Sequence, residues 1–228
     1  MDQPVSDPGS VVATLRKLII EGHYAAGTRL AEIPVAEALG VSRTPVRLAF
    51  RSLQQEGLLQ TTGKRGFVVR AFSEQDVQCA VEVRGVLEGL AARRLAERGM
   101  SEAVQAALQG CIDEGAQLLA KGRLTQHAVG AWSRINNVFH RTIVEATDSH
   151  VIADAIARNN HLPFASADSI VIDPDALDRE YDKLRFAQLQ HQLVFDALVQ
   201  RESARVEMLM REHAYIGLRY GKLLGRLK

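Results

Sequence analysis

The sequence predicts a mostly α-helical protein, in which three short helices and a β-hairpin are followed by an all-α bundle of about six helices. Apolar residues recur every three or four positions through most of the chain, which is the spacing of a buried helix face. Two β-prone runs flank residues 63–66, where Gly-Lys-Arg-Gly indicates a turn. These observations divide the chain into a mixed N-terminal part and a helical remainder.

Length and composition favour a protein of two modest domains. The chain has 228 residues, of which 46% are apolar and 24% charged. No apolar run approaches the roughly 18–20 residues that span a bilayer. The polar N-terminus lacks a secretory signal, and we expect a flexible tail over residues 1–9. Cys79 and Cys111 offer no disulfide framework, so we expect both to be buried in a cytoplasmic protein.

Residues 10–72 have the pattern of a winged helix-turn-helix. The expected elements are helices over 10–22, 32–39 and 43–56 and strands over 58–62 and 67–70. Ser10 is the expected N-cap of the first helix. Gly40 supplies the tight turn between the second and third helices, and the hairpin after the third helix is the wing. We expect no other short strand.

Charge is distributed unevenly along the chain. Residues 1–72 hold nine Lys or Arg against six Asp or Glu, a net charge of +3, whereas residues 73–228 hold nineteen against twenty-one, a net charge of −2. Within residues 29–70 the ratio is seven basic to three acidic. This surplus permits nucleic-acid binding at the N-terminal end.

The third predicted helix has the residues that DNA contact requires. Arg43, Arg47 and Arg51 are four positions apart and project from one face. Ser42 is the expected N-cap, and Thr44 lies in the first turn, where free backbone N–H groups favour phosphate. Arginine forks can bind guanine edges in the major groove. A solvated arginine stripe on a surface helix is the alternative.

The full pattern resembles the GntR family of winged-helix regulators over about residues 11–70. The most specific part is the run LGVSRTPVR at 39–47, followed by Glu-Gly at the helix end. The resemblance implies that Arg43, Thr44 and Arg47 contact DNA and that the wing lies near the minor groove. Ile33 stands where the family often has a basic residue, so one phosphate or base contact is either missing or supplied by Arg29 or Arg51. The expected DNA-binding residues are Arg29, Ser42, Arg43, Thr44, Arg47, Arg51, Lys64, Arg65 and Gly66.

Residues 73–228 are expected to form an all-helical domain. The predicted helices span 73–98, 101–121, 124–146, 149–160, 175–200 and 202–224, with an irregular segment over 162–174. Asn136 and His140 share one helix face, and His191 and His213 lie on two later helices. Convergence of these four side chains would suit a divalent transition metal. Taken singly, a helical histidine is more often a surface or satisfied core residue.

Four stretches in this part resemble the FCD ligand-binding domain of the FadR subfamily. They lie at 81–98, 136–147, 189–198 and 210–213. In that subfamily a D-x-x-F-H pair and two later histidines commonly hold zinc or nickel; here the pair is N-x-x-F-H, with the weaker ligand Asn136. The resemblance implies a homodimer and an effector pocket. Arg84 is expected to pair with a carboxylate effector there, unless it forms an ion pair with Glu88.

The function that these patterns favour is a ligand-responsive transcriptional regulator, expected to be a repressor that binds operator DNA and a small organic acid. One alternative is a purely structural metal in the bundle. Another is a metal-dependent hydrolase with a regulatory DNA-binding domain. The sequence contains no HExxH motif or nucleophile elbow, and shows no carboxylate beside the metal ligands as an evident general base. We therefore expect a regulator and not an enzyme.

Overall fold

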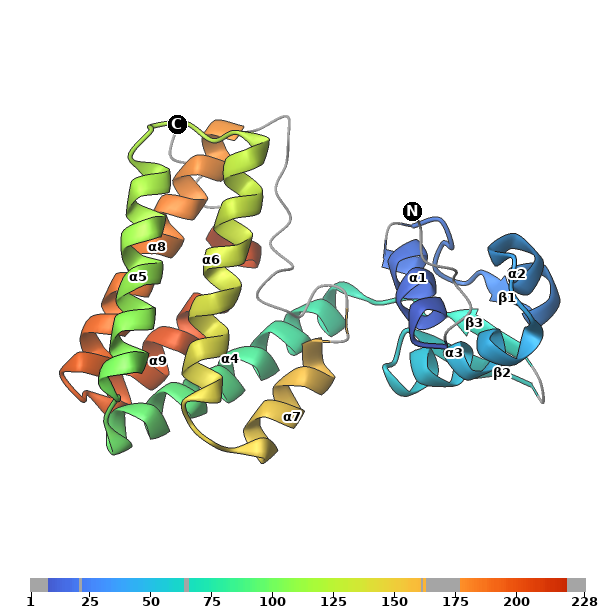
Figure 1. The fold of residues 1–228 in the computed structure, drawn as a ribbon, viewed down its shortest axis with the longest axis horizontal. Helices are drawn as coiled ribbons and strands as arrows, with labels where there is room; N and C mark the ends of the chain where they lie inside the picture. The colour runs from blue at the N-terminus through green and yellow to red at the C-terminus, as the bar shows by residue number, and fades with distance from the viewer. Residues whose placement is uncertain (1–7, 21, 64–65, 161, 163–176, 221–228) are drawn as a thin grey trace. The chain divides into compact units, whose positions relative to one another are not determined.

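The computed structural model describes residues 8–20, 22–63, 66–160, 162 and 177–220. Within these residues the protein is mostly helical with one small sheet near the N-terminus, which confirms the predicted fold class (Figure 1). The chain forms two compact units, the first ending at Asp76 and the second beginning at Val77. Each unit has a hydrophobic core of its own.

The first unit combines helices with a three-stranded antiparallel sheet. Strand β3 is central and pairs with β1 on one side and with β2 on the other. Its elements among the described residues are α1 (Pro8–Ile20), β1 (Arg29–Leu30), α2 (Glu32–Leu39), α3 (Arg43–Gln55), β2 (Leu59–Thr62) and β3 (Gly66–Val69). The pairing of Thr62 with Gly66 at the tip makes β2 and β3 the predicted wing hairpin.

Helix α3 is the centre of this unit because its apolar residues recur with helical spacing. Val46, Ala49, Phe50 and Leu53 are all fully buried and pack in one cluster with α1. Gly40 ends α2 with a positive φ of 66°, a conformation that glycine adopts without strain. The turn is therefore tight, and α3 begins only a few residues after α2 ends.

Two expectations for the first unit were wrong. Helix α1 begins at Pro8, so Ser10 lies inside the helix and residues 8 and 9 are not part of a tail; proline is compatible with a first helical turn. Residues 1–7 lie outside the described residues. Strand β1 was not expected, since two residues are too short to show alternation. It forms because the N–H of Gly27 donates to the carbonyl of Val69 at 2.9 Å, beside the ladder.

The second unit is an all-helical bundle. Helix α5 packs against α6 and α8, and α8 packs against α9 (Figure 1). Its helices among the described residues are α4 (Glu74–Arg98), α5 (Glu102–Leu119), α6 (Gln126–Glu145), α7 (His150–Asn160), α8 (Leu177–Val199) and α9 (Ser203–His213). This matches the predicted bundle of about six helices. Every described helix is too short or too polar to cross a bilayer.

Side-chain caps fix where two of these helices begin. At α4, the Ser73 hydroxyl accepts from the N–H of Asp76 at 3.1 Å, while the Asp76 carboxylate accepts from the N–H of Ser73 at 2.9 Å. At α5, the Ser101 hydroxyl accepts from the N–H of Val104 at 3.3 Å. Ser73 and Ser101 thus cap the starts of α4 and α5, close to the predicted helix starts at 73 and 101.

The last predicted helix, over 202–224, is interrupted. The α-helix ends at His213, and a π-helical turn follows at Ile216–Tyr220. At the break, the guanidinium of Arg84 donates to the carbonyl of Ala214 at 2.8 Å. A side chain from α4 therefore satisfies a carbonyl at the end of α9. The end of the predicted helix and most of the predicted irregular segment over 162–174 lie outside the described residues.

Helix α4 packs closely on α9 at one face and exposes apolar side chains at another. A methyl group on Gly89 would lie 2.9 Å from the Glu207 carbonyl oxygen, so α9 approaches as closely as glycine permits. Val83 and Val86 are about 40% exposed. Cys79, four residues before Val83 on the same helix, is also exposed, although we expected it to be buried. Cys111 is buried as expected.

Candidate metal centre and nucleic-acid interface

The exposed face of α3 carries the predicted arginines together. Arg43, Arg47 and Arg51 line one groove of about 650 Å³, together with Ile33 from α2 and Gly66 from β3 at the wing. Thr44 is exposed on the same helix, outside the residues that line this groove. The arginines give the groove the positive charge that attracts a DNA backbone.

The other predicted DNA-contacting residues have more varied positions. Arg29 lies on β1, and its Nε would be 3.6 Å from a methyl group on Gly66, which places it beside the wing. Ser42 is the N-cap residue of α3, as predicted, with an extended backbone, but its side chain makes no capping hydrogen bond among the described residues. Lys64 and Arg65 lie outside the described residues.

Arg43 is held by an acidic neighbour from the preceding helix. Its guanidinium lies 3.4 Å from the Glu32 carboxylate, and the Arg43 side chain is 63% exposed. An exposed ion pair of this kind contributes little to stability, about 0–1 kcal/mol. A DNA phosphate or base edge can therefore replace Glu32 as the partner of Arg43.

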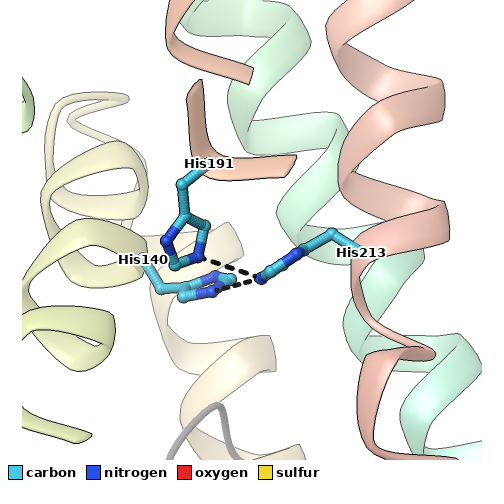
Figure 2. A group of neighbouring side chains, drawn as sticks. All are labelled: His140, His191 and His213. Carbon is cyan, nitrogen blue, oxygen red and sulfur yellow. Dashed lines mark hydrogen bonds between the residues drawn. The ribbon is translucent and has the colours of Figure 1, made fainter. Parts of the chain in front are cut away.

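Three buried histidines meet in the core of the second unit. His140 comes from α6, His191 from α8 and His213 from the last turn of α9 (Figure 2). The Nε2 atom of His213 lies 3.2 Å from Nε2 of His140 and 3.1 Å from Nε2 of His191. The same nitrogen of all three rings thus faces one point, although the residues are widely separated in sequence.

Polar side chains outside the cluster orient two of the rings. Nδ1 of His213 donates to the Gln190 side-chain oxygen at 2.9 Å. Nδ1 of His140 lies 3.1 Å from a carboxylate oxygen of Glu88, which is itself buried. A neutral imidazole has one N–H, so a proton on Nδ1 leaves the Nε2 lone pair facing the centre.

Aromatic packing orients the third ring. His191 stacks on Phe139 with ring centroids 4.2 Å apart and lies nearly parallel to Trp132 at 5.9 Å. Phe139 immediately precedes His140 on α6, so one helix supplies both a ligand candidate and the surface that holds another.

Burial favours the neutral form of two of these histidines. It lowers the pKa of His191 and of His213 well below the usual value, because the protonated form loses its hydration, and the neighbouring imidazoles act in the same direction. For Glu88, burial acts to raise the pKa, but the contact with His140 and the positive charge of Arg84 outweigh burial and lower it. The cluster therefore places two neutral imidazoles close to an ionised carboxylate.

The spacing of the nitrogens fits a bound transition metal. Ligand nitrogens at about 2.0–2.1 Å from one zinc ion lie about 3.3 Å apart in a tetrahedral site. The observed separations of 3.1 and 3.2 Å are close to this value. Neutral imidazole nitrogens are ligands that zinc and nickel accept. Asn136, the fourth predicted ligand, is buried one helical turn before His140 on α6.

A small pocket opens onto this centre from the side of α7. It has a volume of about 270 Å³, and its lining includes His140, Glu88 and Arg141. Arg84, the predicted effector-binding residue, is not among its lining residues. Arg84 is buried and bonds the Ala214 carbonyl, and its Nε has no hydrogen-bond partner within the part of the chain that the structure describes. Its predicted alternative, an ion pair with Glu88, is not formed within 4 Å among the described residues, since Glu88 contacts His140 instead.

Sequence reasoning found the three histidines but missed the residues that orient them. Glu88 was considered only as a partner for Arg84, and Gln190 was not considered. Periodicity places both on buried faces, yet a single sequence gives no signal that links α4 to α6 or α8 to α9. Arg141 at the pocket was missed for the same reason.

Fold and site together define a DNA-binding regulator: a winged helix-turn-helix with an exposed arginine face, and a helical unit with a buried histidine centre. Residues 9–69 match the family described as bacterial regulatory proteins, gntR family, and residues 79–215 match the FCD domain. The protein belongs to the GntR family and contains an FCD domain.

Individual relatives support the same conclusion. The chain is 28% identical over 215 residues to the HTH-type transcriptional repressor RspR of Escherichia coli K12, covering 92% of this chain and 86% of the relative. It is 33% identical over 143 residues to an HTH-type transcriptional regulator from the TAR-I ttuE-ttuC' intergenic region of Agrobacterium vitis, covering 61% and 82%. Among solved structures, E. coli McbR/YncC shares the fold with a TM-score of 0.59 at 20% identity, covering 99% of both chains.

Proposed function

We propose that this GntR-type regulator holds a divalent transition metal, zinc or nickel, in its FCD domain. The observation that carries the proposal is the convergence of three buried Nε2 atoms at 3.1 and 3.2 Å. His140, His191 and His213 would be ligands, with Asn136 as a weaker fourth. Bound metal would supply a Lewis-acidic centre for an anionic effector.

The effector that suits this centre is a small organic acid. The pocket beside His140 has about 270 Å³, which admits only a small molecule. A carboxylate would find Arg141 in the pocket lining and the metal at its inner end. Arg84 bonds the backbone just after His213, so it would act on the effector site through the end of α9 or by direct contact.

Effector binding would change operator affinity, with the protein acting as a cytoplasmic repressor. The name of the relative RspR supports repression. Arg43, Thr44 and Arg47 would contact operator DNA from α3. A homodimer would place two such helices on a palindromic operator, and the exposed apolar row on α4 supports self-association.

One pair of variants tests the metal proposal. His140→Ala combined with His191→Ala should leave the purified protein without stoichiometric metal in an elemental assay. His127→Ala combined with His150→Ala is the matched control, because both residues are exposed histidines of the same unit. Stoichiometric metal in the first double variant would exclude the proposed site.

A second measurement separates a sensing metal from a structural one. Operator binding is measured with a panel of two- to six-carbon carboxylic acids, in metal-loaded and chelated protein. Loss of the acid response after metal removal, with DNA binding retained, supports sensing. A lowered melting temperature with an unchanged acid response would support a purely structural metal.

A further inference from the structure

Among the described residues, the arginine groove is lined by three exposed apolar residues, Ala31, Ile33 and Pro34, of which Ile33 has the largest side chain. Ile33, the second residue of α2, is 52% exposed and lines the groove with Arg43, Arg47 and Arg51. Its neighbour Glu32 pairs with Arg43, so the first turn of α2 is tied to the first turn of α3. Ile33 is therefore held beside the start of the helix that is proposed to enter DNA.

Exposure leaves Ile33 able to contact a partner outside the protein. About half of its surface is in water, and contact with another apolar group would be favourable. Single exposed apolar residues are common on protein surfaces. In the described part of the first unit, however, the large apolar residues this exposed are Ile33 and Leu48, and both lie on the arginine-bearing side of the helix pair. Only Ile33 lines the groove.

The chemistry of Ile33 limits what it can contact in DNA. An aliphatic side chain can neither pair with a phosphate nor hydrogen-bond a base edge. The arginines around it already supply those contacts. The apolar group that base edges present in the major groove is the C5 methyl of thymine.

We propose that Ile33 determines specificity by packing on the C5 methyl group of a thymine in the operator. The inference rests on the proposed function, in which α3 enters the major groove. It adds an apolar contact from α2 to the polar contacts of Arg43 and Arg47. Each half of a palindromic operator would then require a thymine at one fixed position.

The test begins with full-length wild-type protein and a pool of random DNA duplexes. The enriched duplex is then resynthesised with deoxyuridine replacing one thymine at a time, which removes only the C5 methyl. At constant salt, wild type should lose about fourfold in affinity at one thymine of each half-site, the equivalent of one unburied methyl. Ile33→Ala should bind the thymine duplex more weakly and show no further loss with deoxyuridine at that position.

Controls and a gain-of-function variant complete the design. Val151→Ala removes a residue that is 80% exposed in the other unit and should retain the wild-type deoxyuridine response. Ile33→Arg should change the preferred base at that position from thymine to guanine. A wild-type protein insensitive to every deoxyuridine, or a fourfold loss that persists in Ile33→Ala, would overturn the inference while DNA binding stands. If wild type enriches no duplex, the proposed operator recognition fails as well.

Discussion

A carboxylate oxygen of Glu88 lies 3.1 Å from Nδ1 of His140, and both residues are almost completely buried. The contact joins α4 to α6 at the side of the imidazole that faces away from the cluster. An ionised carboxylate there favours a proton on Nδ1 and leaves Nε2 available as a ligand. Glu88 therefore belongs to the functional centre although it would not touch the metal.

Replacement of Glu88 by Gln should weaken metal binding. The amide keeps the size of the side chain but loses the charge that holds the Nδ1 proton of His140. Loss of such a supporting contact lowers metal affinity about 10–100-fold. Competition against a chromophoric chelator measures the change.

Glu82→Gln is the matched control, since Glu82 is exposed on the same helix. It should retain wild-type affinity. Equal metal affinity in the Glu88→Gln protein would show that the carboxylate does not orient the imidazole.

The close packing of Gly89 of α4 on α9 should also influence metal binding at the histidine cluster. A methyl group on Gly89 would meet the Glu207 carbonyl oxygen at 2.9 Å, so Gly89→Ala must displace the backbone of α9. Overpacking of this kind destabilises a protein by about 1–3 kcal/mol. Because α9 carries His213, metal affinity should fall together with the free energy of unfolding.

Gly110 on α5 provides a control in which the same substitution should raise the free energy of unfolding. A methyl group there has no neighbour within 4 Å, so Gly110→Ala should stabilise the helix by about 0.5–1 kcal/mol without changing metal affinity. Urea unfolding and chelator competition on the three proteins separate the two effects. Stability gained by Gly89→Ala would contradict the tight α4–α9 packing.

The sequence allowed the architecture to be predicted, because helical periodicity is a local signal. The three ligand candidates, His140, His191 and His213, followed from the resemblance to the FCD domain, because their spacing alone carries little information. The contacts that orient the ligand candidates could not be predicted from the sequence. Glu88 reaches His140, and Arg84 reaches Ala214, across different helices, and tertiary packing alone decides such pairs. The end of α9 at His213 was missed for a related reason. Apolar spacing continues past it, and the arginine of α4 that donates to the Ala214 carbonyl at the break is distant in sequence.

Asn136 offers a test of the fourth ligand position. Asn136→Asp would add a negative charge one turn from His140, and a carboxylate is a stronger ligand for a dication than an amide. If Asn136 faces the metal, affinity in the chelator competition should rise at least tenfold. Weaker binding in Asn136→Asp would mean that this side chain points away from the ion. Asn159→Asp is the control, because Asn159 bonds the Ala80 carbonyl on α4 instead.

Loss of Arg47 should weaken binding to the operator more than binding to DNA of unrelated sequence. It is exposed in the groove with Arg43 and Arg51, and Glu32 pairs with Arg43 rather than with Arg47. Arg47→Ala should weaken operator binding by about 1–3 kcal/mol and relax the preference at one base pair. Arg134→Ala removes an exposed positive charge from α6 and controls for net charge. Fluorescence anisotropy measures the affinity of the variant for the operator and, separately, for a scrambled duplex. An equal loss on the two duplexes would assign Arg47 to the phosphate backbone, because a phosphate contact weakens binding to all sequences alike.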